Sequence, residues 1–188
     1  MGYDTDGLRD SAVGSAARQR ESRMMTGLFR DRESAEGAYR SLSSRGYGKD
    51  DVNLMMSDDT RNKYFKDDDS ELGTKAWEGA GKGAAIGGGV GATLAAIAAI
   101  GTTLALPGLG LLVAGPIAAA LSGAGVGALT GGLIGALVGH GIPEEHAKVY
   151  DKGIREGGIV MGVNPRTTED ADYFEREWRN NRAESLYR

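Results

Sequence analysis

The sequence predicts an α+β fold: a small split sandwich of the ferredoxin-like kind, strand-helix-strand followed later by helix-strand, interrupted by a glycine-zipper α-helical hairpin. On both sides of a central tract, short apolar runs of strand length alternate with amphipathic helical patterns. The tract contains no Asp, Glu, Lys or Arg between Lys82 and Glu144, although charged residues make up 26% of the chain. We therefore expect two flanks that form one domain, an inserted hairpin and a C-terminal helix.

The expected segments follow from these shifts in composition. They are a polar N-terminal tail, 1–23; the first half of the α+β domain with an acidic loop, 24–73; the glycine-rich hairpin, 74–142, with its turn at 106–110; the second half of the domain, 143–164; and a C-terminal amphipathic helix, 165–188. The tail has too few apolar side chains to fold alone. It lacks the apolar core of a secretory signal, and Asp6 stands where a myristoylation motif needs Ser or Thr.

The first flank reads as strand, helix and strand. Met24–Phe29 is an apolar run of strand length, and the next segment places apolar residues on one helical face, with Asp31 as N-cap and Gly46 just beyond the helix end. Asp51–Ser57 predicts a second strand, and 57–73 predicts an acidic loop.

The second flank supplies the missing half of the sandwich. Pro143 suits the first position of a helix, and Gly158–Val163 predicts a third strand. Beyond it, Thr167 and Asp170 form a capping pair for the terminal helix. The expected core residues of the two flanks are Met25, Leu28, Val52, Leu54, Ile159, and Met161 or Val163. The contact face of the terminal helix is expected to consist of Tyr173, Phe174 and Trp178.

Glycines recur every fourth residue in the tract. The first run is Gly79, Gly83, Gly87 and Gly91, and the second is Gly123, Gly127, Gly131, Gly135 and Gly139. Glycine costs about 1 kcal/mol relative to alanine in an exposed helix, so nine of them at one spacing indicate close helix packing. The hairpin turn is expected at Pro107, Gly108 and Gly110, because proline ends a helix and glycine accepts positive φ.

Two environments fit this hairpin. Each half is long enough to cross a bilayer, and Lys75, Lys82, Lys148 and Lys152 would place both flanks in the cytoplasm. The apolarity comes mostly from Ala and Gly, however, which drive insertion less than Leu, Ile or Phe. The hairpin is therefore expected either in the bacterial inner membrane or buried between protein copies in a soluble cytoplasmic assembly.

The chain offers no recognisable catalytic, metal or cofactor site. It has no cysteine, and Lys82 is followed by glycine where a phosphate-binding loop needs Ser or Thr. His140 and His146 lie six residues apart, off a common helical face, and the acidic loop lacks the spacing of a calcium loop. The net charge of −4 gives no general attraction to nucleic acid. We expect no enzyme, no cofactor, no metal and no nucleic acid partner, and the sequence identifies no small-molecule substrate.

From Met25 to Val163 the sequence resembles the bacterial general-stress and heat- or cold-induced protein family with a glycine-rich membrane hairpin. The specific pieces are Pro107–Gly110, Ala114–Pro116, and Gly141–Glu145 leading to Tyr150 and the Gly157–Gly158 pair. The resemblance implies a stress-associated, non-enzymatic protein. The polar tail and the terminal helix lie outside it.

These observations favour a structural protein that self-associates through glycine zippers as a homo-oligomer. A membrane-anchored regulatory or ligand-binding module is the alternative. A channel-forming oligomer is less favoured, because the tract has no charged or amide residue to line a wet pore.

Overall fold

A computed structural model describes residues 24–65, 104–106, 110–118 and 126–188. The elements are β1 (Met25–Phe29), α2 (Arg32–Ser44), η1 (Lys49–Asp51), β2 (Val52–Ser57), α3 (Asp58–Phe65), β3 (Leu104–Leu106), β4 (Leu111–Ala114), α7 (Val126–Gly139), α8 (Glu144–Arg155), β5 (Ile159–Val163), α9 (Thr168–Asn180) and β6 (Glu184–Tyr187). The predicted α+β class is confirmed. The polar tail and most of the first half of the expected hairpin lie outside the described residues.

The strands form one antiparallel sheet in the order β3-β4-β2-β5-β1-β6. β5 pairs with β1 on one side and with β2 on the other, so that Val163 lies opposite both Met25 and Val52. The two flanks therefore share one sheet, as the sequence predicts, although more than 100 residues separate β2 from β5.

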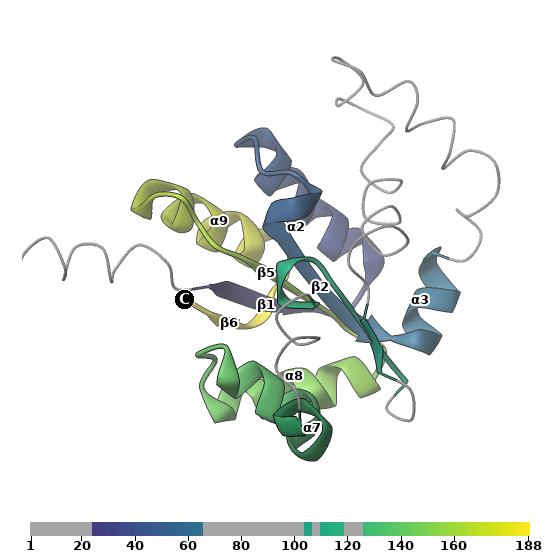
Figure 1. Ribbon diagram of the computed structural model, residues 1–188. Helices are drawn as coiled ribbons and strands as arrows, with labels where there is room; N and C mark the ends of the chain where they lie inside the picture. Colours follow the sequence, from purple (N-terminus) through teal and green to yellow (C-terminus); the bar gives the residue numbers. More distant parts are fainter. Residues whose placement is uncertain (1–23, 66–103, 107–109, 119–125) are drawn as a thin grey trace, which may run out of the picture.

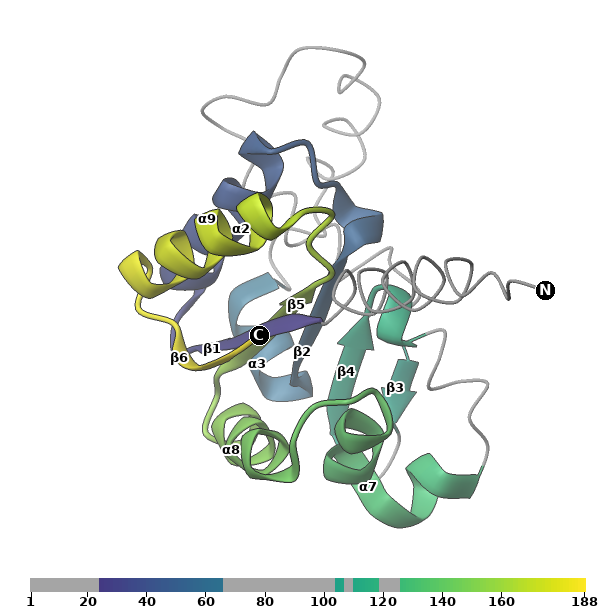
Figure 2. The same cartoon turned by 90° about the vertical axis from the view of Figure 1, so that its left-hand side faces the viewer.

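Helices cover both faces of this sheet (Figures 1 and 2). α2 and α9 pack on one face, while α7 and α8 pack on the other. The strands alternate accordingly: Leu54 and Met56 face α2 and α9, whereas Met55 faces α7 and α8. A two-layer sandwich would leave one sheet face bare, so the observed three layers differ from the ferredoxin-like expectation.

Every core residue expected from the two flanks is buried. On the α2/α9 face the core is aromatic, with the Phe29 and Trp178 rings edge to face at 5.6 Å and those of Tyr47 and Phe174 at 4.9 Å. The C-terminal helix is thus docked on the domain through Phe174 and Trp178, two of the residues expected on its contact face.

The expectation of a helical hairpin is wrong between Leu104 and Ala114. The segments on either side of the expected turn are strands, and β3 pairs antiparallel with β4. The physical reason is the open edge of β2, whose backbone groups need partners. β4 supplies them, and its four residues are all buried.

Two further assignments are corrected. The acidic loop expected over 57–73 begins with helix α3, because the Ser57 hydroxyl accepts a hydrogen bond from the N–H of Thr60 and caps the helix. The terminal helix expected over 165–188 ends at Asn180 and is followed by β6. The predicted caps at Asp31 and Thr167 are confirmed, whereas Pro143 precedes the first helical residue rather than being it.

Candidate functional site

α7 contains the described part of the expected glycine zipper. The helix carries no charged residue, and Gly132 interrupts it with φ 58° and ψ −156°. Gly127 and Gly131 precede this interruption, and Gly135 and Gly139 follow it. The stripe expected to run straight through the helix is therefore divided, because Gly132 adopts a positive φ that side chains disfavour.

After the interruption, α7 has an inner and an outer face. Leu133, Ala136 and Leu137 are buried against the sheet at helical spacing. Residues at 135, 138 and 139 lie on the opposite side of the helix. Gly135 and Gly139 are exposed there, and Val138 is 42% exposed. We call these three residues the outer face of α7.

The outer face is open as well as apolar. A Cβ atom added at Gly139 would meet no heavy atom within 4 Å. Elsewhere an added Cβ would meet close neighbours: at Gly153 of α8 it would lie 2.4 Å from Leu28 Cδ2, and at Gly115 only 2.2 Å from the carbonyl oxygen of Val52. Gly139 is thus not explained by close contacts with the described residues.

The other expected site residues are only partly described. Gly79, Gly83, Gly87, Gly91, Gly123, Pro107 and Gly108 lie outside the described residues. Gly110 is exposed with φ 59°, and its carbonyl oxygen accepts a hydrogen bond from the N–H of Asp58. His140 Nδ1 hydrogen-bonds to the carbonyl oxygen of Ala136 at 3.0 Å and so caps the C-terminal end of α7.

The structure also brings together a polar network that the sequence analysis missed. Tyr150 Oη lies 2.8 Å from Thr26 Oγ1 and donates to the carbonyl oxygen of Ser185 at 2.6 Å. His146 Nδ1 lies 3.1 Å from Ser185 Oγ. Burial raises the pKa of the Tyr150 phenol to about 12. No sequence signal marked this network, because Ser185 belongs to the strand that was expected to be helix.

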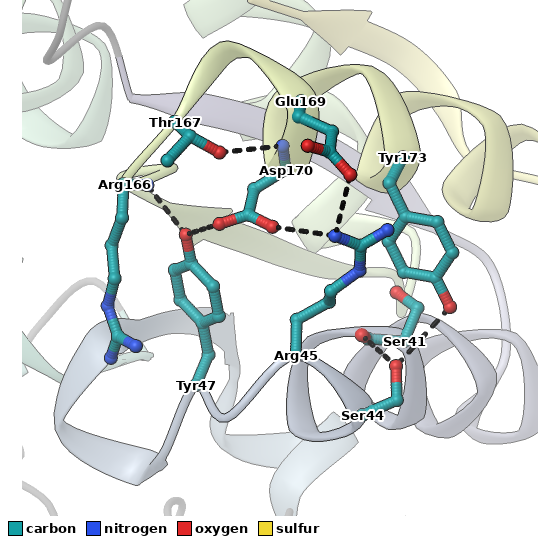
Figure 3. Close-up of polar contacts among 9 residues, drawn as sticks. All are labelled: Ser41, Ser44, Arg45, Tyr47, Arg166, Thr167, Glu169, Asp170 and Tyr173. Atoms are coloured by element: carbon teal, nitrogen blue, oxygen red, sulfur yellow. Dashed lines mark hydrogen bonds and ion pairs between the residues drawn. The ribbon is translucent and has the colours of Figure 1, made fainter.

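A second polar cluster joins α2 to α9 (Figure 3). Asp170 accepts from Tyr47 Oη at 2.8 Å and pairs with Arg45 at 3.3 Å, while the N–H of Arg166 donates to Tyr47 Oη. Arg45 and Arg166 also stack on Tyr173 and Tyr47 respectively. Because Arg45 pairs with Asp170 and Arg166 pairs with Asp51, we interpret the cluster as a tether between layers rather than a binding site.

Two classes of feature are not found in the described parts of the chain. No helix there is both long and apolar enough to cross a bilayer. Nor do His, Asp and Glu side chains gather there in groups of three or more that would hold a metal ion.

Comparisons with protein-family models, with curated proteins and with solved structures find no match for this chain.

Proposed function

We propose that this chain is a non-enzymatic structural protein that self-associates through its glycine-rich helices. The observation that carries the proposal is the outer face of α7, which is uncharged, contains two exposed glycines and lies on a helix held firmly by its inner face. The partner is a second copy of the same chain.

Exposed glycine destabilises a helix but allows another helix to pack closely against it. Exposed glycines weaken a helix by about 1 kcal/mol each relative to alanine. Without side chains, however, they allow a second helix to approach closely, which gives van der Waals contacts and weak Cα–H···O bonds. An uncharged face also allows identical copies to meet without like-charge repulsion. Val138 would bury its exposed apolar surface in the same contact.

The resemblance to the bacterial general-stress and heat- or cold-induced family supports placing this assembly in stress physiology. The glycine-rich tract supports two settings, a bilayer or a large protein-enclosed assembly. In both settings the glycine helices of different copies pack together.

The test uses the full chain purified without detergent and sized by light scattering. We expect particles of several copies, well above the monomer mass of 19.6 kDa. The double variant Gly135→Leu, Gly139→Leu should form smaller particles, because leucine keeps a neighbouring backbone away. A homogeneous 19.6 kDa species for the parent, or unchanged particles for the double variant, would contradict the proposal.

The control is the double variant Glu145→Leu, Lys148→Leu, which adds two leucines to exposed positions of α8. It should assemble like the parent. Circular dichroism on all three proteins checks that the α+β domain is folded. Recovery of the parent only in the membrane fraction of expressing cells would favour the bilayer setting, and detergent-free particles would favour the protein-enclosed one.

A further inference from the structure

The C-terminal strand β6 is a partly exposed edge strand whose pairing with the sheet is irregular. It lies at the edge of the sheet beside β1, where the chain ends (Figure 1). No residue of β6 is fully buried. Its pairing with β1 shifts between Thr26–Tyr187 and Leu28–Glu184, so that Ser185 and Leu186 together lie opposite Gly27. This is a β-bulge, and Ser185 within it has φ 47°.

The turn that leads into β6 is strained. Among the described residues, four helices end with the same pair of backbone hydrogen bonds, in which the two residues after the C-cap donate to carbonyls of the last turn. In three of them the positive-φ residue is glycine: Gly46 after α2, Gly141 after α7 and Gly157 after α8. After α9 the same position is held by Arg182, with φ 60°. A side chain in this conformation is disfavoured by contact between Cβ and backbone.

The surface that receives β6 comes from distant parts of the chain. Tyr150 donates to the Ser185 carbonyl, Arg30 Nε bonds to Glu184 at 2.8 Å, and the His146 ring lies 5.1 Å from that of Tyr187. These partners belong to α8 and to the segment after β1. Two of these contacts are made by β6 side chains, Glu184 and Tyr187, and the same strand from another copy would make all three.

We propose that β6 is exchanged between two copies of this chain. In the exchanged dimer each β6 lies beside β1 of the other copy, and residues 181–183 form an extended hinge. Every contact of β6 is conserved in the exchange, while the strained conformation of Arg182 is released. Strain in a short hinge is a known cause of such swapping. This surface is separate from the outer face of α7.

The test uses disulfide trapping, because the chain has no cysteine. Thr26→Cys is introduced into one full-length chain and Tyr187→Cys into a second chain of distinguishable mass. Thr26 and Tyr187 are register partners, so their Cβ atoms lie about 4.5 to 5.5 Å apart, close enough for a disulfide. The two proteins are mixed, incubated at high concentration and oxidised. We expect a mixed disulfide in a yield above that of random collision, because exchange places the two cysteines side by side.

Random collision is controlled by pairing the Tyr187→Cys chain with an Asp50→Cys chain, in which the cysteine is exposed on η1. If the mixed disulfide is no more abundant than in this control, and a chain with both Thr26→Cys and Tyr187→Cys closes only within itself, the proposal is overturned.

The hinge is tested separately, on the same disulfide yield. Arg182→Gly should lower the exchanged fraction about tenfold, because glycine accepts φ 60° without strain. Arg182→Ala keeps the strained backbone but removes the ion pairs to Asp31 and Glu33, so it should exchange like the parent or more. Equal yields for the Gly and Ala variants would overturn the role of the hinge. Gly139→Leu should leave the yield unchanged, which separates this proposal from assembly through α7.

Discussion

The α2/α9 layer and α7 cover opposite faces of the same sheet, but their outer surfaces differ. The outer surface of α2 and α9 carries ion pairs, such as Arg32–Glu36 and Arg179–Glu175, and caps at Asp31 and Thr167. α7 has no charged residue and an interruption at Gly132. Burial of an inner face is therefore common to both, and they differ in the outer face, which is charged on α2 and α9 and uncharged on α7.

The largest effect is expected from breaking the α2/α9 layer. Trp178 is fully buried and packs edge to face on Phe29, so Trp178→Ala should lower the free energy of unfolding by about 3 to 5 kcal/mol. Urea unfolding followed by circular dichroism measures this. Trp178→Phe is the control: it keeps an aromatic ring and loses an indole N–H that has no hydrogen-bond partner among the described residues. A loss below 1 kcal/mol for the alanine variant would show that this layer does not hold the domain together.

A somewhat smaller effect is expected where β4 leaves the sheet. At Gly115, φ is 97° and an added Cβ would lie 2.2 Å from the Val52 carbonyl oxygen. Gly115→Ala should therefore cost about 2 to 4 kcal/mol, since strained backbone and displaced strand add together. Gly46 also has a positive φ but open space around it, so Gly46→Ala should cost only about 1 kcal/mol. Equal losses in thermal or urea unfolding would mean that the close approach to β2 is unimportant.

Alkaline pH should weaken the α7/α8 layer through Tyr150. The phenol has a folded-state pKa of about 12, against an ordinary value of 10.0, because burial disfavours the phenolate. The stability that depends on this pKa difference is fully present below pH 10. It is lost as the pH rises toward 12, because Tyr150 loses its phenol proton at lower pH in the unfolded state than in the folded state. The loss is on the order of 2 kcal/mol.

One variant separates the contribution of Tyr150 to this pH dependence from those of other buried tyrosines. Burial also raises the pKa of Tyr39 and Tyr47 in the α2/α9 layer, so Tyr150→Phe should remove only part of the alkaline slope. The measurement is the free energy of unfolding from pH 8 to pH 11. If the slope of the variant matches that of the parent, Tyr150 does not titrate with the unfolding transition.

Local patterns predicted the domain well where pattern and packing agree. Short apolar runs of strand length located β1, β2 and β5, and short polar side chains located the caps at Asp31 and Thr167. The packing of residues 24–57 with residues 143–163 was also predictable, because neither segment has enough apolar surface to fold by itself. Residues 111–114 were misassigned because a short apolar run suits a buried strand as well as a buried helix. The open edge of β2 decides between them, and it is a property of the assembled sheet.

The candidate site was predicted in part. Spacing identified Gly135 and Gly139, but no sequence rule places the interruption at Gly132, where one glycine among several takes a positive φ. β6 was missed because the usual stop signal of a helix, a glycine beyond its end, is replaced by Arg182. The Tyr150–Ser185 contact could not be foreseen without β6.

The smallest effect is expected from adding a single methyl group to α7. Gly139 lies at the end of α7 in open space and without a positive φ, so Gly139→Ala should raise the free energy of unfolding by up to about 1 kcal/mol. Gly153→Ala in α8 is the matched control, because its new methyl group would lie 2.4 Å from Leu28 Cδ2 and should destabilise by about 1 to 3 kcal/mol. Both are measured by urea unfolding at low protein concentration.

The sign of the change in unfolding free energy on Gly139→Ala tests whether the outer face of α7 is used within the domain or in a contact with another copy. A stabilising alanine means that the domain itself gains nothing from this glycine, which is the result that a contact outside the domain predicts. A destabilising alanine would mean that the face is already used within the chain, and the case for assembly through α7 would then lose its main support. Repeating the measurement at a concentration where particles form separates the two contributions, because close helix contact tolerates alanine less well than glycine. The gain from Gly139→Ala should shrink there, while the loss from Gly153→Ala should stay the same.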